Sequence, residues 1–123
     1  MNKILFIILG LTIILSSCMK YQHTASFEGF VKQGTTGMNG VIVQIFDQSG
    51  NNELFKTTTF ARNSGLMTAA GYYFGTLIWE ENVFYPLPPL EKYKYVVVRA
   101  SGTQINATLD EDVVTVIPDI VLP

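Results

Sequence analysis

Short runs of β-branched and aromatic residues, each ended by turn-forming residues, constrain the fold of this 123-residue chain most strongly. From residue 26 onward these runs are rich in Val, Ile, Thr, Phe and Tyr, and Gly, Asn, Asp and Pro separate them. No segment after Leu15 repeats its apolar residues at helical spacing. This pattern is typical of antiparallel strands joined by tight turns, so the sequence predicts an all-β domain.

The turn clusters set the expected strand boundaries. Gly- and Asn-rich turns are expected where the chain needs positive φ, over residues 33–40, 48–52 and 62–65. Alternate side chains of a strand share one face, which predicts a core containing Val41, Val43, Ile45, Val96, Val98 and Ala100. The expected strands are 26–32, 41–47, 53–60, 66–77, 93–100, 103–109 and 113–122, with breaks near Ala69–Gly71 and at Pro118, while 79–85 is ambiguous. Seven or eight strands fit a single antiparallel β-sandwich.

The first 18 residues have a different character. Lys3 precedes an apolar run from Ile4 to Leu15, and two small residues then lead to Cys18. Charge, apolar core and small residues form the pattern of a secretory signal, and the run is shorter than the ~20 apolar residues that a membrane helix needs. Leu15-Ser16-Ser17-Cys18 resembles the lipobox of bacterial lipoproteins. The alternatives are an ordinary signal peptide with a chance cysteine, or an uncleaved membrane helix.

The lipobox resemblance implies how the protein is held. In that family the cysteine thiol receives a diacylglyceryl group, the peptide is cut before it, and the new amino group is acylated, for example with palmitate. Residues 1–17 would be the signal peptide, 18–26 a lipid-anchored tether and 27–123 the β-sandwich. Met19 replaces the aspartate of the enterobacterial inner-membrane signal, and residues 20–23 lack an acidic run. These features favour the periplasmic face of the outer membrane, if the source is Gram-negative.

Composition excludes several function classes. Cys18 is the only cysteine, so neither a disulfide framework nor a thiolate zinc site is expected. The formal net charge is −2, and removing residues 1–17, whose only charged residue is Lys3, makes it −3. That charge gives no basic footprint for nucleic acid. Hydrophobic residues make up 48% of the chain, which indicates a folding domain.

The order of motifs resembles the carboxypeptidase regulatory-like, transthyretin-like (prealbumin-like) sandwiches, which are similar to the Cna protein B-type repeats. The segments that carry the resemblance are Gly29–Val31, Gly37–Val43, Asp47–Gly50, Thr57–Thr59, Ser64–Leu66, Tyr95–Gly102 and Ile117–Leu122. The chain departs from the pattern over Gly65–Tyr95, which is longer than usual, and at Thr103, where an aromatic residue is common. The resemblance implies a Greek-key sandwich that acts as a non-enzymatic module.

An internal isopeptide bond, which the Cna B-type relatives often carry, needs a lysine on the first strand and an asparagine or aspartate on the last. Lys32 and Asp119 are loosely placed for it. Because Lys32 lies at a strand end and Asp119 follows a proline, we expect two exposed side chains instead.

The titratable residues do not form a catalytic set. His23, the only histidine, lies in the expected tether, where we expect it to be solvent-exposed and unable to act in nucleophilic catalysis. Glu80 and Glu81 are adjacent and would face opposite sides of a strand. Residues 110–112 are acidic, but their spacing offers few of the six or more oxygens that calcium needs. We therefore expect no enzymatic activity, cofactor or metal.

Aromatic residues gather late in the chain. Eight of the fifteen lie in residues 72–95, and this segment also contains the proline-rich stretch 86–90. An exposed apolar patch here would suit a partner site, and the leading hypothesis is a protein module that presents it to another envelope protein. The alternative is a carbohydrate-binding module that uses the aromatic residues of 72–95, and a third interpretation has Trp79 plugging one end of the sandwich. The candidate binding residues are Trp79, Phe84, Tyr85, Leu87 and Leu90.

Overall fold

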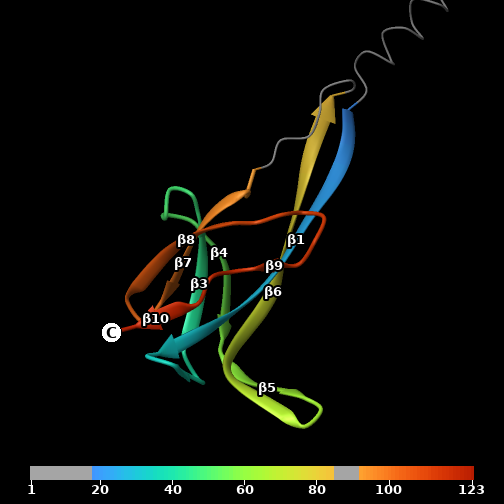
Figure 1. The fold of residues 1–123 in the computed structure, drawn as a ribbon. Helices are drawn as coiled ribbons and strands as arrows, with labels where there is room; N and C mark the ends of the chain where they lie inside the picture. The colour runs from blue at the N-terminus through green and yellow to red at the C-terminus, as the bar shows by residue number, and fades with distance from the viewer. Residues whose placement is uncertain (1–17, 85–91) are drawn as a thin grey trace, which may run out of the picture. The chain divides into compact units, whose positions relative to one another are not determined.

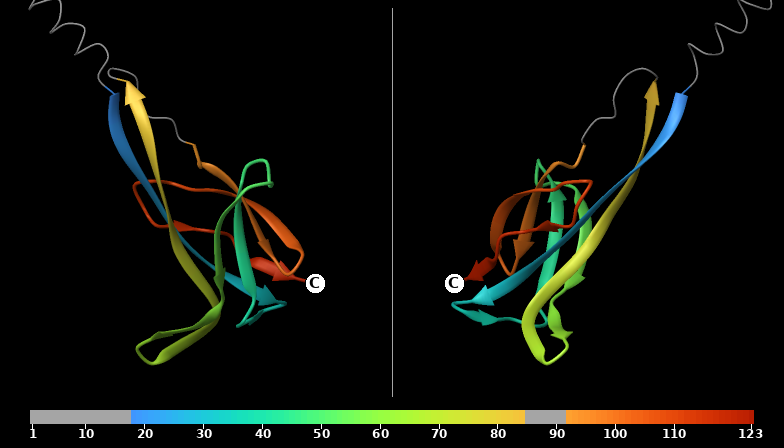
Figure 2. Two further views of the ribbon diagram at one scale, coloured as in Figure 1. Left: turned by 180° about the vertical axis from the view of Figure 1, so that it is seen from behind. Right: turned by 45° about the vertical axis from the view of Figure 1, so that its right-hand side comes forward.

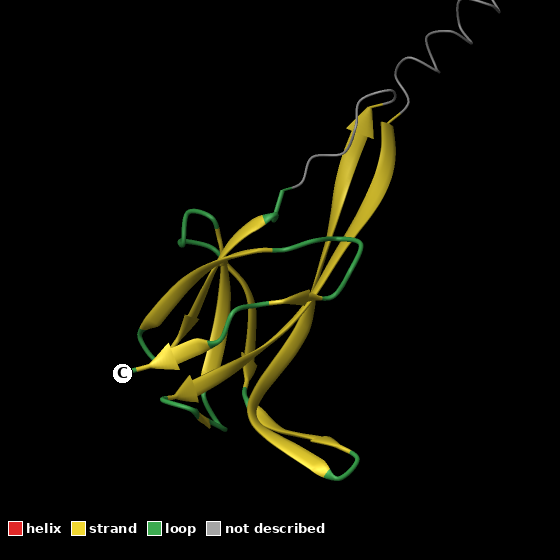
Figure 3. Ribbon diagram, in the orientation of Figure 1, coloured by secondary structure: helices red, strands yellow, loops and turns green. Residues whose placement is uncertain are grey.

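The structure, a computed structural model, describes residues 18–84 and 92–123 and contains only strands and loops in these ranges (Figures 1 and 3). The all-β prediction is confirmed. In chain order the strands are β1 (Cys18–Gln33), β2 (Thr36–Gly37), β3 (Ile42–Asp47), β4 (Glu53–Thr58), β5 (Phe60–Ser64), β6 (Met67–Phe84), β7 (Tyr95–Ala100), β8 (Thr103–Thr108), β9 (Thr115–Val116) and β10 (Ile120–Leu122).

The chain divides into two compact units. The described part of the smaller unit consists of residues 18–23 and 79–84, which are the first residues of β1 and the last residues of β6. The larger unit contains residues 24–78 and 92–123 and holds nearly all of both sheets.

A four-stranded sheet of the larger unit has the order β4-β3-β7-β8. All of its pairs are antiparallel, and Ile45 of β3 lies opposite Phe55 of β4 and Val98 of β7. The β3–β4 turn is fixed by Asp47, whose carboxylate accepts hydrogen bonds from the hydroxyl of Ser49 and the side-chain amide of Asn52. These bonds lower the pKa of Asp47 to about 2. The hairpin predicted over residues 48–52 is therefore confirmed.

The second sheet has the order β10-β1-β6-β5, and β2 and β9 also pair with β1. β1 and β6 lie side by side in every view (Figures 1 and 2). Their antiparallel register is visible in two side-chain hydrogen bonds, Ser26 to Thr76 and Tyr72 to Glu28. The short strands β9 and β10 are the exceptions, because both run parallel to β1.

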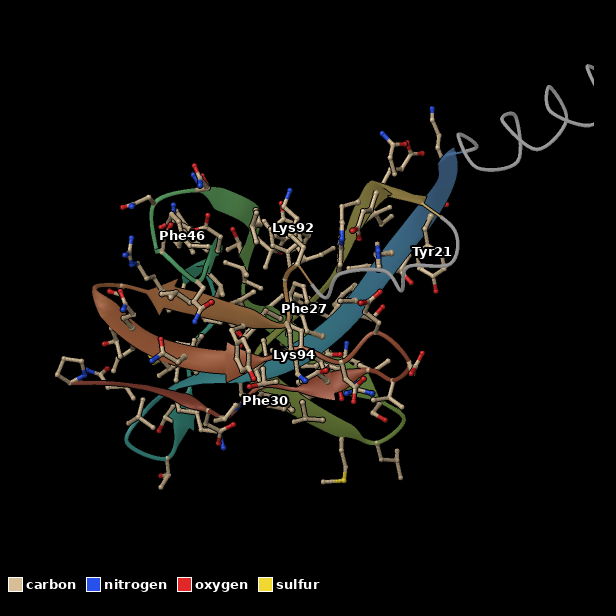
Figure 4. The ribbon with its side chains drawn as sticks, turned by 90° about the horizontal axis from the view of Figure 1, so that it is seen from above. Tyr21, Phe27, Phe30, Phe46, Lys92 and Lys94 are labelled. Atoms are coloured by element: carbon tan, nitrogen blue, oxygen red, sulfur yellow. The ribbon has the colours of Figure 1, made fainter. Side chains whose placement is uncertain are left out.

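The core of the larger unit lies between the two sheets. Phe27 of β1 meets Phe55 of β4 edge to face, with ring centroids 5.2 Å apart. Phe27 is 1% exposed, whereas Phe30 leaves the same strand on its opposite side (Figure 4). The predicted core positions Val43, Ile45, Val96, Val98 and Ala100 are all buried, while Val41 is half-buried. Two facing sheets with this shared core are consistent with the predicted sandwich.

Several boundaries differ from the prediction. The first strand begins at Cys18, eight residues before the expected start, so residues 18–26 belong to β1. Residues 67–84 form one long strand, and the expected turn at 62–65 is mostly strand β5. The closing segment is interrupted around Pro118, as expected, and forms only β9 and β10. The start of β1 and the end of β6 were missed because these two strands pair with each other, and the paired segments lie far apart in the chain, as the Ser26–Thr76 hydrogen bond shows.

Candidate functional site

The residues selected from the sequence fall in different parts of the chain. Cys18 is the first residue of β1, and Phe84 is the last residue of β6. Tyr85, Leu87 and Leu90, like the signal segment 1–17, lie outside the described residues. Within residues 18–84 and 92–123, no helix has the length and apolar character needed to cross a membrane.

His23 is buried in the smaller unit, and the prediction of an exposed linker histidine is wrong. Its side chain is 2% exposed, and its Nε2 lies 2.9 Å from Oε2 of Glu81. The imidazole stacks on the indole of Trp79, with centroids 5.0 Å apart and planes 5° apart. The ring of Tyr21 also contacts the imidazole, with centroids 4.6 Å apart. The physical reason is that β1 continues to Cys18, so strand alternation turns His23 to a packed side rather than into solvent.

The same packing covers part of Trp79, a candidate binding residue. The side chain is half-buried, and one face of its ring is covered by His23. Glu80 is exposed, whereas Glu81 pairs with His23. The two carboxylates are thus used separately, in agreement with strand alternation.

The outward face of the second sheet carries a cluster of aromatic side chains from three strands. We call this surface the aromatic face and define it by Phe30 of β1, Phe60 of β5, and Tyr72 and Phe74 of β6. Ring centroids lie 5.4 Å apart for Phe30–Tyr72, 5.5 Å for Phe60–Tyr72 and 5.9 Å for both Phe60–Phe74 and Tyr72–Phe74. Phe60 is 41% exposed and Phe74 is 56% exposed. The rings therefore pack against one another around the buried Tyr72, while Phe60 and Phe74 remain open to solvent.

Charged groups border the aromatic face. The Tyr72 hydroxyl donates a hydrogen bond of 2.7 Å to Oε2 of Glu28. The guanidinium of Arg62 lies 4.8 Å from the Tyr72 ring centroid and 3.8 Å from the same Glu28 oxygen. Burial, together with the bond to Glu28, raises the pKa of the Tyr72 phenol, which favours the protonated form that donates this bond. Lys32 lies 5.7 Å from the centroid of Phe30.

The apolar character continues beyond the rings. Ile78 of β6 shares the strand face of Tyr72 and Phe74 and is 63% exposed. Val116 of β9 lies opposite Glu28 in the register and is 69% exposed. A solvated sheet face normally carries polar side chains, so an apolar face of this kind is a candidate contact surface.

Lys32 and Asp119 are brought together. Lys32 Nζ lies 2.8 Å from Asp119 Oδ2, and their side chains are 33% and 44% exposed. Because both side chains are partly solvated, the two residues form a surface ion pair. A solvated ammonium is a poor nucleophile, so this arrangement does not favour the isopeptide bond. Among the described residues, no group of three or more His, Cys, Asp and Glu side chains could hold a metal ion.

A hollow of about 360 Å³ lies on the outward side of the four-stranded sheet. It is formed by Gln48 of the β3–β4 turn, the start of β7 and the end of β8. The lining residues are Gln48, Tyr95, Val96, Val97, Asn106, Ala107 and Thr108.

Comparisons of this chain with known protein families, with curated protein sequences and with solved structures give no match. Of the aromatic face, the sequence indicated the segment that contains Tyr72 and Phe74. It missed Phe30 and Phe60, which join the cluster only through strand pairing, although both alternate with inward-facing residues in their own strands.

Proposed function

We propose that this protein is a non-catalytic, lipid-anchored cell-envelope protein whose β-sandwich binds another envelope protein through the aromatic face. The observation that carries this proposal is the exposure of Phe60 and Phe74 on an outward sheet surface. The proposal includes a Greek-key, transthyretin-like topology and a position at the periplasmic face of the outer membrane.

The chemistry of the aromatic face supports a protein partner. Its centre consists of aromatic rings, and its border carries Glu28, Lys32 and Arg62. Protein interfaces share this plan, with aromatic residues and arginine enriched and a polar rim around an apolar centre. Burying apolar surface is worth roughly 25 cal/mol per Å², so covering these exposed rings supplies a driving force for association.

Sequence motifs support the anchor. Cys18 follows Leu15-Ser16-Ser17, and it is also the first residue of β1, so a lipid on Cys18 would be joined directly to a strand. Each buried lipid CH₂ contributes ~0.8 kcal/mol, and two or more chains hold a protein stably. Confinement to a membrane raises the effective concentration of a partner in the same membrane. A modest contact at the aromatic face is then sufficient.

A photo-crosslinking residue placed at position 74 of the full chain in its host cells tests the proposed partner. We expect one defined cross-linked envelope protein, identified by mass spectrometry. Phe60→Glu should abolish this cross-link because it places a charge among the rings. Leu66→Glu is the matched control, since Leu66 is fully exposed at the β5–β6 turn and lies outside the aromatic face. A cross-link that persists in the Phe60→Glu protein, or none at all at position 74, would contradict the proposal.

A further inference from the structure

The hollow on the four-stranded sheet has a construction suited to a small ligand. Tyr95 lies opposite Thr108 across the β7–β8 pair, and Val97 lies opposite Asn106. Val97 also lies beside Phe46 of β3, and Gln48 follows two residues later at the β3–β4 turn. Strand pairing thus brings polar side chains from β8 and from the β3–β4 turn around one tyrosine of β7.

Exposure distinguishes the floor of the hollow from its walls. Val97 is on the outward side of β7 but is only 6% exposed, because its neighbours on β3 and β8 cover it. Tyr95 is 52% exposed. Gln48, Asn106 and Thr108 are exposed as well. The result is an apolar floor with a tyrosine and three polar side chains at its edges.

The polar groups are available to a ligand. Among the described residues, no side-chain hydrogen bond joins Gln48, Asn106 or Thr108 to another residue. Each amide offers donors and an acceptor, and the threonine hydroxyl can do both. The lining residues carry no formal charge. This set matches a ligand that has several hydroxyl groups and no charge.

The size and shape of the hollow also suit a small, uncharged ligand with several hydroxyl groups. The volume of about 360 Å³ lies near the lower end of the range of ~300–1,000 Å³ for small-molecule sites. An exposed tyrosine provides a flat apolar surface with a polar end, on which the C–H face of a sugar ring can stack. The ammonium of Lys94 lies 5.9 Å from the Tyr95 ring centroid, at the margin of this surface.

We propose that this hollow binds a neutral saccharide, which stacks on Tyr95 and exchanges hydrogen bonds with the side-chain amides of Asn106 and Gln48. The inference is independent of the proposed protein partner, because it concerns the other sheet. It extends the function to a protein that binds a glycan with one sheet and a protein with the other.

The test uses the full chain purified in a detergent without a sugar headgroup. Saturation-transfer NMR and isothermal titration calorimetry would measure binding of maltose, cellobiose and N,N′-diacetylchitobiose, with an acidic disaccharide as a further arm. We expect at least one neutral disaccharide to bind with a dissociation constant that changes less than twofold between low and high salt. Binding of the acidic disaccharide alone, and only at low salt, would assign the attraction to Lys94 and overturn the proposal.

Variants separate stacking from hydrogen bonding. Tyr95→Ala should weaken binding at least tenfold, whereas Tyr95→Phe should retain most of it because the ring remains. Asn106→Ala should weaken binding about fivefold to tenfold, in line with the loss of a hydrogen bond. Circular dichroism spectra and melting temperatures would show that each variant is folded.

Phe74→Ala is the matched control, since it removes a similarly exposed ring from the other sheet. Saccharide affinity should be unchanged in Phe74→Ala, and the envelope-protein cross-link should be unchanged in Tyr95→Ala. If none of the disaccharides binds at millimolar concentration, or if folded Tyr95→Ala binds like the wild type, the saccharide proposal fails while the protein-partner proposal stands.

Discussion

Thr59 shows how one buried hydroxyl connects three segments of the chain. Its side chain is 3% exposed, accepts a 3.0 Å hydrogen bond from the amide of Val41 and donates a 2.5 Å bond to the carbonyl of Met38. Its backbone carbonyl also accepts a bond from the amide of Gly40. Thr59 therefore fixes the segment that leads into β3.

Thr59→Val should lower the free energy of unfolding by about 1–3 kcal/mol, because it keeps the shape but leaves the Val41 amide unsatisfied. Urea denaturation would measure the loss. The neighbouring Thr58→Val is the control, since Thr58 is exposed and should change stability by less than about 0.5 kcal/mol. Equal effects of the two substitutions would refute this role of Thr59.

Tyr73 presents the opposite case, a buried hydroxyl without a hydrogen-bond partner among the described residues. Its side chain is fully buried, and an added Cβ at Gly29 would lie 2.5 Å from its oxygen. Gly29 is therefore required for the phenol to fit over β1. Burial raises the pKa of Tyr73 well above its usual value, and the charge of Asp119 adds to the shift.

Tyr73→Phe should raise the free energy of unfolding by about 1 kcal/mol at neutral pH, because an unpaired buried hydroxyl is costly. A second effect appears in alkali. Above the unfolded-state pKa of about 10, the unfolded chain releases the phenol proton while the folded protein retains it, so stability falls as pH rises. Urea titrations at pH 8 and pH 11 should show a smaller fall for Tyr73→Phe. Parallel decreases for the two proteins would contradict this account.

Among the elements, β6 contains a bulge that the sequence only partly predicted. Phe60 pairs with Tyr72 and Arg62 with Ala69, so three steps along β6 face two along β5. Gly71 lies within this irregularity with φ of 80°, and its amide donates a 2.7 Å bond to Oδ1 of Asn39. The break expected near Ala69–Gly71 is thus a bulge inside one continuous strand. It sets the facing of Tyr72 and Phe74 relative to Phe60.

Gly71→Ala should lower the free energy of unfolding by about 2–5 kcal/mol, because the cost of a positive φ for alanine adds to the cost of overpacking. An added Cβ would collide with the carbonyl of Val31 and lie 2.6 Å from the amide of Met38. Gly65→Ala is the control, because Gly65 also has positive φ but nothing within 4 Å of its added Cβ, so only about 1–2 kcal/mol should be lost. Thermal unfolding would compare them, and a smaller loss for Gly71→Ala would exclude a packing role.

Local patterns predicted the strands whose signal is complete within a few residues. β3, β7 and β8 each alternate or carry β-branched residues between glycine-containing turns, and their observed bounds lie within two residues of the expected ones. The ends of β1 and β6 could not be predicted in this way. Residues 20–24 are mostly polar, and His23 is buried only because β6 supplies Trp79 and Glu81 beside it.

At the scale of the whole molecule, we propose one lipid anchor and two binding surfaces, one on each sheet. The density of rings in residues 72–95 predicted an aromatic surface over Trp79 to Leu90, of which residues 85–90 lie outside the described residues. Within the described residues, strand pairing gathers Phe30, Phe60 and Phe74 from three strands, an arrangement that no single stretch of sequence displays. The hollow beside Tyr95 likewise depends on the pairing of β7 with β8.

Lipid attachment at Cys18 is the central claim, because membrane confinement is what allows a modest contact to act. Metabolic labelling with radioactive palmitate in the host cell, followed by purification of the wild-type and Cys18→Ser proteins, tests it most directly. We predict label in the wild-type polypeptide, and none in Cys18→Ser, which should accumulate as the uncleaved precursor. An unlabelled wild-type protein, or a Cys18→Ser protein that is processed and membrane-bound like the wild type, would contradict the account.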